Sequence, residues 1–231
     1  MKKILGWLSI GEWVLWLVSV VAIVLSFVLF GGGDYLTLVA SLIGVTSLIF
    51  NAKGNPVGQA LMVVFSIMYA IVSLTFRYYG EMLTYLGMTM PMSVIALVSW
   101  LKHPYKGNKS QVEVNVISAN EWLFMFGLTA IVTFGFYFVL DAFDTANIVP
   151  STISVTTSFI AVYLTFRRSH FYALGYAAND VVLIVLWTMA SLQNAVYWSV
   201  VVCFVAFLIN DLYGFLSWQK MKKRQTANSD C

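Results

Sequence analysis

The chain has 231 residues, of which 60% are hydrophobic and only 10% are charged, and its mean hydropathy is +0.84. Soluble domains carry about 25% charged residues, so this composition excludes a soluble globular protein and indicates an integral membrane protein. The formal net charge of +3 does not indicate a nucleic-acid partner, because the basic residues fall in the loops between apolar runs.

Apolar runs long enough to cross a bilayer, about 20 residues each, predict eight transmembrane helices. They extend approximately over residues 13–30, 35–50, 57–76, 82–101, 122–140, 148–166, 171–189 and 195–218. The first run is expected to be retained, because no small-residue cleavage pattern closes it. We therefore predict an all-α integral membrane protein, with a single membrane domain over residues 1–231 and a cytoplasmic tail over residues 219–231.

The positive charges of the loops predict the orientation of the chain. When alternate loops are assigned to the cytoplasm, twelve of the thirteen lysines and arginines fall on that side, and Arg77 alone falls on the other. Cytoplasmic loops are enriched in lysine and arginine. We therefore expect a multi-pass protein with both termini in the cytoplasm.

Two stretches of the sequence match at an offset of 118 residues. Val98-Ser99-Trp100-Leu101-Lys102 aligns with Leu216-Ser217-Trp218-Gln219-Lys220, and Gly58 matches Gly175 at nearly the same offset. Residues 35–101 are therefore predicted to repeat, in parallel orientation, as residues 148–218. Residues 122–140 then form a linker helix, and residues 13–30 form an extra N-terminal helix. Membrane transporters that are built from two such repeats bind their substrate between the repeats, near the bilayer midplane.

Two aspartates interrupt the last two apolar runs, and each follows an asparagine. A carboxylate that faces lipid costs about 2.5 to 3.5 kcal/mol, so both are expected to face the interior of the bundle. Helical spacing places Asp180 on one face with Trp187, and Asn210 one turn from Tyr213. The candidate ligand-binding residues are Asn179, Asp180, Trp187, Asn210, Asp211, Tyr213 and, from the first repeat, Tyr69. Of the two aspartates, Asp180 is expected to contact ligand, and Asp211 to serve the inner gate or helix contacts.

Structural roles remain open for several of these residues. Each Asn-Asp pair also suits helix-to-helix hydrogen bonding. Trp100 and Trp218, beside lysines at helix ends, suit interfacial anchoring, and Pro91 suits a packed kink or a hinge. These last three residues are the candidate gate or hinge positions.

No metal site and no catalytic residues are expected. The histidines and cysteines lack metal-ligand spacing, and no nucleophile stands beside a base. A membrane-embedded enzyme or a ligand-binding sensor is the alternative class of function, because two carboxylates can in principle act as acid and base.

The motif Tyr79-Gly80-Glu81-Met82, followed by Pro91-Met92 and Trp100, together with Asn210-Asp211-Leu212-Tyr213-Gly214-Phe215 and Trp218, resembles the PnuC family of bacterial nicotinamide riboside transporters. The resemblance covers roughly Asp34 to Lys222. It implies a SWEET-like 3+1+3 fold, no cofactor, and facilitated diffusion of the vitamin across the bacterial cytoplasmic (inner) membrane, with a cytoplasmic kinase that traps it. Many relatives carry a tryptophan pair where this chain has Tyr172 and Gly175.

Nicotinamide riboside, a precursor of NAD, combines a pyridinium cation, a carboxamide and a ribose. An aromatic face, an amide and hydroxyl acceptors would bind these groups. Relatives with the tyrosine-glycine-glutamate signature carry thiamine, riboflavin or deoxynucleosides, which are the alternative substrates. A uniporter of one cation would gain about 2.3 kcal/mol from 100 mV, or about 50-fold accumulation. Membrane lipid is an expected partner, and assembly into a homo-oligomer is left open.

Overall fold

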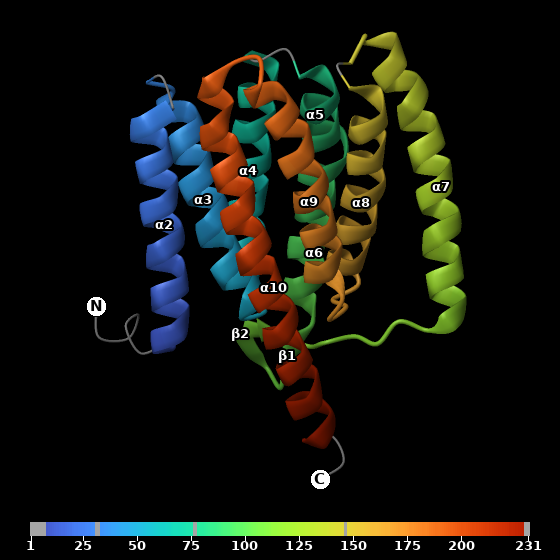
Figure 1. The fold of residues 1–231 in the computed structure, drawn as a ribbon. Helices are drawn as coiled ribbons and strands as arrows, with labels where there is room; N and C mark the ends of the chain where they lie inside the picture. Colours follow the sequence, from blue (N-terminus) through green and yellow to red (C-terminus); the bar gives the residue numbers. More distant parts are fainter. Residues whose placement is uncertain (1–7, 31–32, 76–77, 146, 229–231) are drawn as a thin grey trace.

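The computed structural model describes residues 8–30, 33–75, 78–145 and 147–228, and within them eight helical segments are long and apolar enough to cross a membrane. This confirms the predicted all-α membrane fold. In chain order the helices are α2 (Ile10–Phe30), α3 (Tyr35–Ala52), α4 (Pro56–Thr75), α5 (Tyr79–Thr84) continued by α6 (Met90–Lys102), α7 (Ala119–Ala142), α8 (Ile148–Phe166), α9 (Tyr172–Ser191) and α10 (Trp198–Ala227), as drawn in Figure 1.

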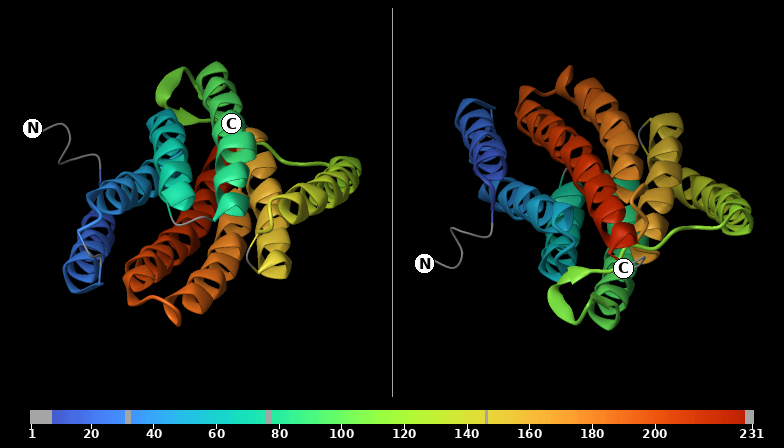
Figure 2. Two further views of the ribbon diagram at one scale, coloured as in Figure 1. Left: turned by 90° about the horizontal axis from the view of Figure 1, so that it is seen from above. Right: turned by 90° about the horizontal axis from the view of Figure 1, so that it is seen from below.

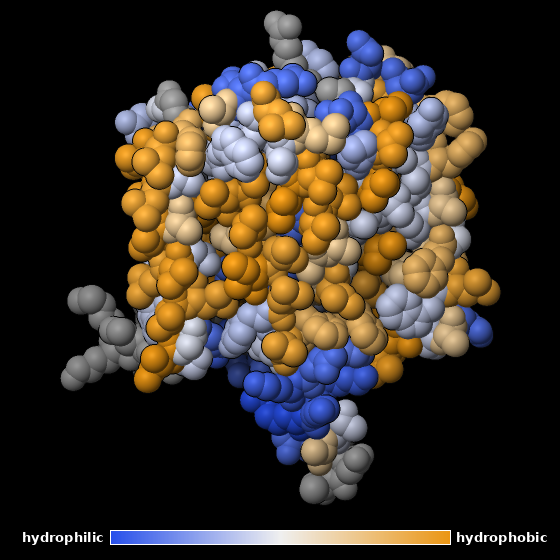
Figure 3. Space-filling model, viewed as in Figure 1, coloured by the Kyte–Doolittle hydropathy of each residue, from blue (hydrophilic) through white to orange (hydrophobic). Residues whose placement is uncertain are grey.

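Helices α2 and α7 lie at opposite flanks of the bundle (Figures 1 and 2). Helix α7 packs mainly on α8, whereas α2 packs on α3 and α10. Both flanking helices expose most of their apolar side chains, and the visible face of the molecule has an apolar belt between two polar ends (Figure 3). A soluble monomer rarely exposes so large an apolar surface, so the belt is the surface that faces lipid.

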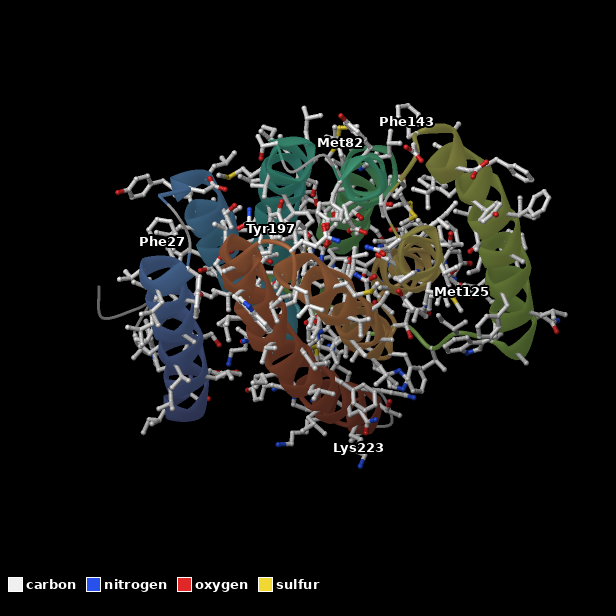
Figure 4. The ribbon with its side chains drawn as sticks, turned by 45° about the horizontal axis from the view of Figure 1, so that its top comes forward. Phe27, Met82, Met125, Phe143, Tyr197 and Lys223 are labelled. Atoms are coloured by element: carbon white, nitrogen blue, oxygen red, sulfur yellow. The ribbon has the colours of Figure 1, made fainter. Side chains whose placement is uncertain are left out.

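The lower end of the bundle in Figure 1, which we call the basic end, collects the positive charges. Of the thirteen lysines and arginines, Lys2, Lys3 and Arg77 lie outside the described residues. The other ten are at the basic end: Lys53, Lys102, Lys106, Lys109, Arg167, Arg168, Lys220, Lys222, Lys223 and Arg224. Figure 4 places Lys223 at this end of α10 and Tyr197 at the opposite, distal end. The charge distribution agrees with the pattern read from the loops.

The basic end contains two features that hydropathy does not predict. Strands β1 (Pro104–Tyr105) and β2 (Asn108–Val112) form an antiparallel hairpin after α6. The predicted tail is helical as far as Ala227, because α10 continues past Trp218 and its Gln225 side chain bonds the backbone of Val112 and Val114. These hydrogen bonds hold the end of α10 against the hairpin.

The fourth span is interrupted near its middle. A π-helical turn, Tyr85–Thr89, separates α5 from α6, and Pro91 follows in the first turn of α6. Proline has no N–H to donate to the preceding turn, and π-helical turns and prolines are common causes of helix kinks. Pro91 therefore accompanies a break in the helix, and its role as a hinge remains a prediction.

Two glycines allow close helix crossings. A Cβ atom built on Gly58 of α4 would lie 2.7 Å from the backbone nitrogen of Asn51 in α3. A Cβ atom built on Gly175 of α9 would lie 2.9 Å from the Cα atom of Ala161 in α8. Small residues allow helix backbones to approach in membrane bundles. The two glycines match at an offset of 117 residues, but the residues that they contact do not correspond, because Asn51 precedes Gly58 by seven residues and Ala161 precedes Gly175 by fourteen.

A Ser-Trp dipeptide at the end of α6 caps the end of α8. Ser99 Oγ donates to the carbonyl of Phe166 at 3.1 Å, and Trp100 Nε1 donates to the carbonyl of Thr165 at 2.9 Å. The last carbonyls of a helix have no partner within it. The carbonyl of Phe166 is satisfied here by a helix of the other predicted repeat, and the carbonyl of Thr165 accepts this bond in addition to the N–H of Arg168.

The matching dipeptide of α10 caps the end of α3 in the same way. Ser217 Oγ donates to the carbonyl of Ala52, and Trp218 Nε1 donates to the carbonyl of Asn51, both at 2.7 Å. The two caps therefore exchange partners between residues 35–101 and 148–218. The boundaries of the repeats remain predictions, which this exchange supports.

We predict that Gly175→Ala lowers the stability of the folded protein in detergent by about 1 to 3 kcal/mol, the usual cost of overpacking. The added methyl group would overlap backbone atoms of Ala161, which cannot move aside like a flexible side chain. Thermal unfolding in a mild detergent measures the effect. Gly127→Ala on α7 is the matched control, because its Cβ would meet no atom within 4 Å; equal melting temperatures of the two variants would contradict the prediction.

Candidate functional site

A small cavity lies at the centre of the bundle, between the two predicted repeats. Its lining combines carboxyl, amide and hydroxyl groups with aromatic rings. The lining residues are Leu48, Met62, Phe65, Tyr85, Thr89, Ser158, Tyr176, Asn179, Asp180, Phe204, Phe207 and Asp211. The cavity has a volume of about 20 Å³, and one water molecule needs roughly 10 to 15 Å³. The structure therefore shows a contracted site, which must widen to admit a ligand larger than water.

The carboxyl groups of Asp180 and Asp211 lie within hydrogen-bonding reach of each other. The two side chains are 96% and 97% buried, and the Oδ2 atom of Asp180 has no donor among the described residues. A hydrogen bond between two carboxyl groups requires that at least one carries a proton. Both carboxyl groups line the same cavity, and the separate roles expected for the two aspartates stay predictions.

Asn179 has a defined orientation. Its side-chain oxygen accepts hydrogen bonds from the hydroxyl groups of Ser154, Thr157 and Ser158 on α8, at 3.3, 2.9 and 2.9 Å. Since the oxygen is held by α8, the NH₂ group is the part of the amide left to donate to a ligand. Ser154 also bonds the buried carboxyl group of Glu81, so the polar network extends from the cavity toward the distal end.

A distal aromatic cluster (Tyr69, Tyr78, Trp187 and Tyr197) closes the cavity on one side. Trp187 Nε1 donates to the hydroxyl of Tyr69 at 2.7 Å. The ring centroid of Trp187 lies 4.7 Å from that of Tyr78 and 5.6 Å from that of Tyr197. Tyr69 and Trp187 are almost fully buried. These two predicted ligand-binding residues do not line the cavity; they belong to the cluster that separates it from the distal end.

A basic-end aromatic cluster (Trp100, Tyr172 and Trp218) closes the opposite side. The ring centroids of Trp100 and Trp218 are 5.3 Å apart, and Tyr172 lies 4.8 Å from Trp218. Neither tryptophan is accessible to solvent. The alternative of interfacial anchoring is therefore wrong for both residues, because anchors sit at the lipid surface and these side chains pack on each other.

Two predicted ligand-binding residues face away from the cavity. The side-chain NH₂ group of Asn210 donates to Ser19 of α2 at 2.9 Å, and the hydroxyl of Tyr213 donates to Glu12 of α2 at 2.8 Å. Glu12 also pairs with Lys53 at 2.9 Å. Asn210 and Tyr213 therefore attach α2 to the core in this structure, and their contact with ligand stays a prediction.

Sequence reasoning missed most of the aromatic and hydroxyl groups of the lining. Helical spacing could have indicated some of them, because Tyr176 is one turn before Asp180 and Phe207 is one turn before Asp211. Thr89 has no such signal, because the π-helical turn shifts the faces of the fourth span. Phe65 and Ser158 belong to helices without a charged residue to mark the inner face.

Tyr172 and Gly175 stand where many relatives have tryptophans. Tyr172 belongs to the basic-end aromatic cluster, and Gly175 lies at the α8–α9 crossing, where an added Cβ would already be too close to Ala161. A tryptophan would not fit at residue 175 with this helix spacing. Among the described residues, no three His, Cys, Asp or Glu side chains are grouped to hold a metal ion.

Comparison with known proteins identifies similar transporters. The chain is 26% identical over 228 residues to the nicotinamide riboside transporter PnuC of Neisseria mucosa, which covers 96% of this chain and 85% of that protein. It is 22% identical over 192 residues to the PnuC of Haemophilus influenzae, with 83% and 82% covered. A solved structure described as the vitamin B3 transporter PnuC superposes with a TM-score of 0.83 at 24% identity, over 95% of both chains.

The superposition shows that the eight-helix fold is shared with that structure. The family model described as nicotinamide mononucleotide transporter matches residues 34–220, which include both predicted repeats and the whole lining of the cavity. The chain therefore belongs to the nicotinamide mononucleotide transporter family.

Proposed function

We propose that this membrane transporter carries nicotinamide riboside into the cell. One observation carries the proposal: two buried carboxyl groups, Asp180 and Asp211, meet in a cavity that is otherwise lined by aromatic, hydroxyl and amide groups. No lysine, arginine or histidine is among the described residues that line it. Such a site favours a cation, and the PnuC relatives are named for a riboside whose pyridinium ring is positively charged.

The remaining groups of the cavity suit the rest of that molecule. The NH₂ group of Asn179 can donate to the carboxamide oxygen, because its own oxygen is already bound to α8. The rings of Phe65, Phe204 and Phe207 offer faces to the pyridinium, an interaction worth about 0.5 to 2 kcal/mol. Ser158 and the carboxyl groups can bond the ribose hydroxyls.

The charge of the cavity discriminates between the named substrates. A mononucleotide adds a phosphate, which carries about two negative charges at pH 7 and would meet Asp180 and Asp211 without a cation beside them. Riboflavin and deoxynucleosides are neutral, so their hydroxyl groups can bond a carboxylate but they gain no attraction between opposite charges. The cavity therefore favours nicotinamide riboside, with thiamine as the cationic alternative.

The two aromatic clusters supply the gates of the transport cycle in this proposal. Tyr69 and Trp187 separate to admit the substrate from the distal side, and Trp100 and Trp218 separate to release it at the basic end. The concentration of positive charge supports the placement of the basic end on the cytoplasmic side of a bacterial inner membrane. A cytoplasmic kinase would then maintain inward flow by phosphorylating the riboside, since the product carries the phosphate that the cavity disfavours.

A binding panel tests the selectivity. We expect the purified protein to bind nicotinamide riboside and thiamine at least tenfold more tightly than nicotinamide mononucleotide, riboflavin or a deoxynucleoside. The cationic rings have no N–H to donate, but two opposite unit charges 4 Å apart attract each other by about 4 kcal/mol at an effective dielectric constant of 20. Isothermal titration calorimetry measures each Kd. Equal affinity for the mononucleotide and the riboside would contradict the role given to the carboxyl pair.

A pair of asparagine variants tests the geometry of the site. Asn179→Ala removes the amide that faces the cavity and is expected to raise the Kd for nicotinamide riboside about tenfold, the value of a hydrogen bond with a buried partner. Asn210→Ala is the matched control, because it removes the bond to Ser19 and should lower the melting temperature while the Kd stays unchanged. The assignment fails if Asn210→Ala weakens binding as much as Asn179→Ala does.

A further inference from the structure

We propose that the basic end holds a second binding site, a pocket for a phosphate monoester that shares no residue with the central cavity. The pocket lies where α2, the end of α3, strand β2 and the final turns of α10 meet (Figure 1). Its volume is about 580 Å³, within the range of about 300 to 1,000 Å³ that is usual for small-molecule sites. Its lining is almost entirely polar: Glu12, Lys53, Asn108, Ser110, Gln111, Ser217, Lys220, Met221 and Arg224.

The pocket has an excess of positive charge. Three of its lining side chains are cations and one is an anion, so the described lining carries a net charge of +2. The carboxylate of Glu12 is already engaged, because it accepts hydrogen bonds from the ammonium group of Lys53 at 2.9 Å and from the hydroxyl of Tyr213 at 2.8 Å. In the described part of the chain, no carboxylate forms an ion pair with Lys220 or Arg224. These two cations are therefore left to attract an anion.

Two amide groups of the hairpin add hydrogen-bond donors. The side-chain oxygen of Asn108 accepts a bond from the backbone N–H of Ser110, and that of Gln111 accepts one from Nη2 of Arg224, both at 3.0 Å. Since each oxygen already has a protein donor, the NH₂ groups are the parts of these amides left to bond a ligand. An NH₂ group donates to an anion and does not accept from a cation. The amides and the cations of the pocket therefore favour the same kind of ligand.

A phosphate monoester matches this pocket better than other anions do. It carries about −1.5 to −2 charges at pH 7 and presents three acceptor oxygens, so it balances the net charge of the lining and accepts from several donors at once. The guanidinium group of Arg224 has five N–H donors, and arginine bonds phosphate through two of them in parallel. A phosphodiester or a carboxylate carries a single negative charge, which would leave one of the two cations without a partner.

The abundance of cations at the basic end has a simpler cause, since cytoplasmic loops are rich in lysine and arginine whatever they bind. That rule accounts for their number and not for the groups beside them. A second pocket, on another face of α10, shows the difference. Lys222 and Lys223 line it, but its described lining contains no residue of the hairpin. This other face of α10 provides the comparison for an experiment.

Two kinds of molecule present a phosphate monoester at this position. One is a soluble phosphorylated compound of the cytoplasm, a class that includes the product of the kinase in the proposed function. The other is the headgroup of a lipid such as phosphatidic acid, because basic pockets between helices on the cytoplasmic side bind lipid headgroups. Helix α2, which contributes Glu12, also exposes apolar side chains to lipid. Both molecules would bond Lys220 and Arg224 through the same group.

An occupied pocket restrains the basic-end gate, a consequence that rests on the proposed function. Lys53 directly follows α3, in the first predicted repeat, whereas Arg224 belongs to α10, in the second. Ser217 also lines the pocket and precedes Trp218 of the basic-end aromatic cluster. A phosphate that bonds both Lys53 and Arg224 connects the two halves of the bundle. Opening of the basic end has to break that connection, so occupancy slows uptake.

Binding assays on the full chain test the site with two probes. Ribose 5-phosphate is the soluble probe, because it has a phosphate monoester and no cationic ring for the central cavity; isothermal titration calorimetry in a detergent measures its Kd. Phosphatidic acid is the lipid probe, and native mass spectrometry compares its retention with that of phosphatidylglycerol, a phosphodiester. Binding of ribose 5-phosphate assigns the pocket to soluble phosphates, and retention of phosphatidic acid alone assigns it to lipid.

Variants locate the bound phosphate. The double substitution Lys220→Gln and Arg224→Gln should weaken binding of the phosphate monoester at least tenfold, the value of a hydrogen bond to a charged group. The bonds of Gln225 to the hairpin remain in this variant, and an unchanged Kd for nicotinamide riboside confirms that it is folded. Lys222→Gln with Lys223→Gln is the matched control, because it removes two charges from the same part of α10 outside the pocket; its binding should match the wild type.

Proteoliposomes measure the effect on the gate. Ribose 5-phosphate on both sides of the membrane, or phosphatidic acid in place of phosphatidylglycerol, should slow uptake of labelled nicotinamide riboside about fivefold or more, the lower end of the usual allosteric couplings. The variant of Lys220 and Arg224 should not be slowed. Equal rates with and without the phosphate monoester overturn the restraint on the gate, while the binding site stands.

The remaining outcomes separate the site from the proposed function. Failure of the wild-type chain to bind either probe overturns the site, and so does equal weakening in the control variant, because binding would then follow the overall charge of α10. Equal retention of phosphatidylglycerol and phosphatidic acid, without binding of ribose 5-phosphate, overturns the assignment to a monoester. Absence of any uptake of nicotinamide riboside overturns the proposed function, and calorimetry still decides the site.

Discussion

Helix ends inside a membrane protein must satisfy their carbonyl groups without water, since each unsatisfied backbone group in hydrocarbon costs several kcal/mol. At two helix ends this chain meets part of the requirement with Ser-Trp dipeptides, each of which donates to the last two carbonyls of a helix in the other half of the bundle. The caps bring Trp100 and Trp218 together between the halves. The hydrogen bonds that cap the helix ends thus also connect the two predicted repeats, and their tryptophans close one end of the central cavity.

The distal closure follows the same geometry. Tyr69 and Trp187 are 118 residues apart and bonded to each other, and Trp100 and Trp218 are separated by the same interval. Residues that are equivalent in two parallel repeats can touch only near the axis that relates the repeats. Both closures therefore lie on that axis, with the cavity between them. In the proposed function, a relative movement of the two halves opens either end while the substrate site stays in place.

In the proposed function, the carboxyl pair makes the central cavity selective for its substrate. No lysine, arginine or histidine stands beside Asp180 and Asp211 among the described residues that line the cavity, so the proposed substrate would supply the positive charge. The proposed site therefore favours the binding of a cation over that of a phosphate. The peripheral helix α2 is attached by a separate set of polar groups, Asn210, Tyr213 and Glu12, which leaves the cavity to the aspartates.

The sequence by itself determined the class of protein, the eight spans and the end that gathers positive charge, because these depend on composition and on the length of apolar runs. It also marked Asp180 and Asp211 as interior, since a carboxylate facing lipid is costly. Only the tertiary structure decided which interior groups meet. Asn179 and Asn210 look alike in sequence, yet one faces the cavity and the other α2. The two aspartates, 31 residues apart along the chain, come into contact because α9 and α10 pack side by side. Such contacts depend on the rotation and crossing of whole helices, which apolar periodicity leaves undetermined when nearly every face is apolar.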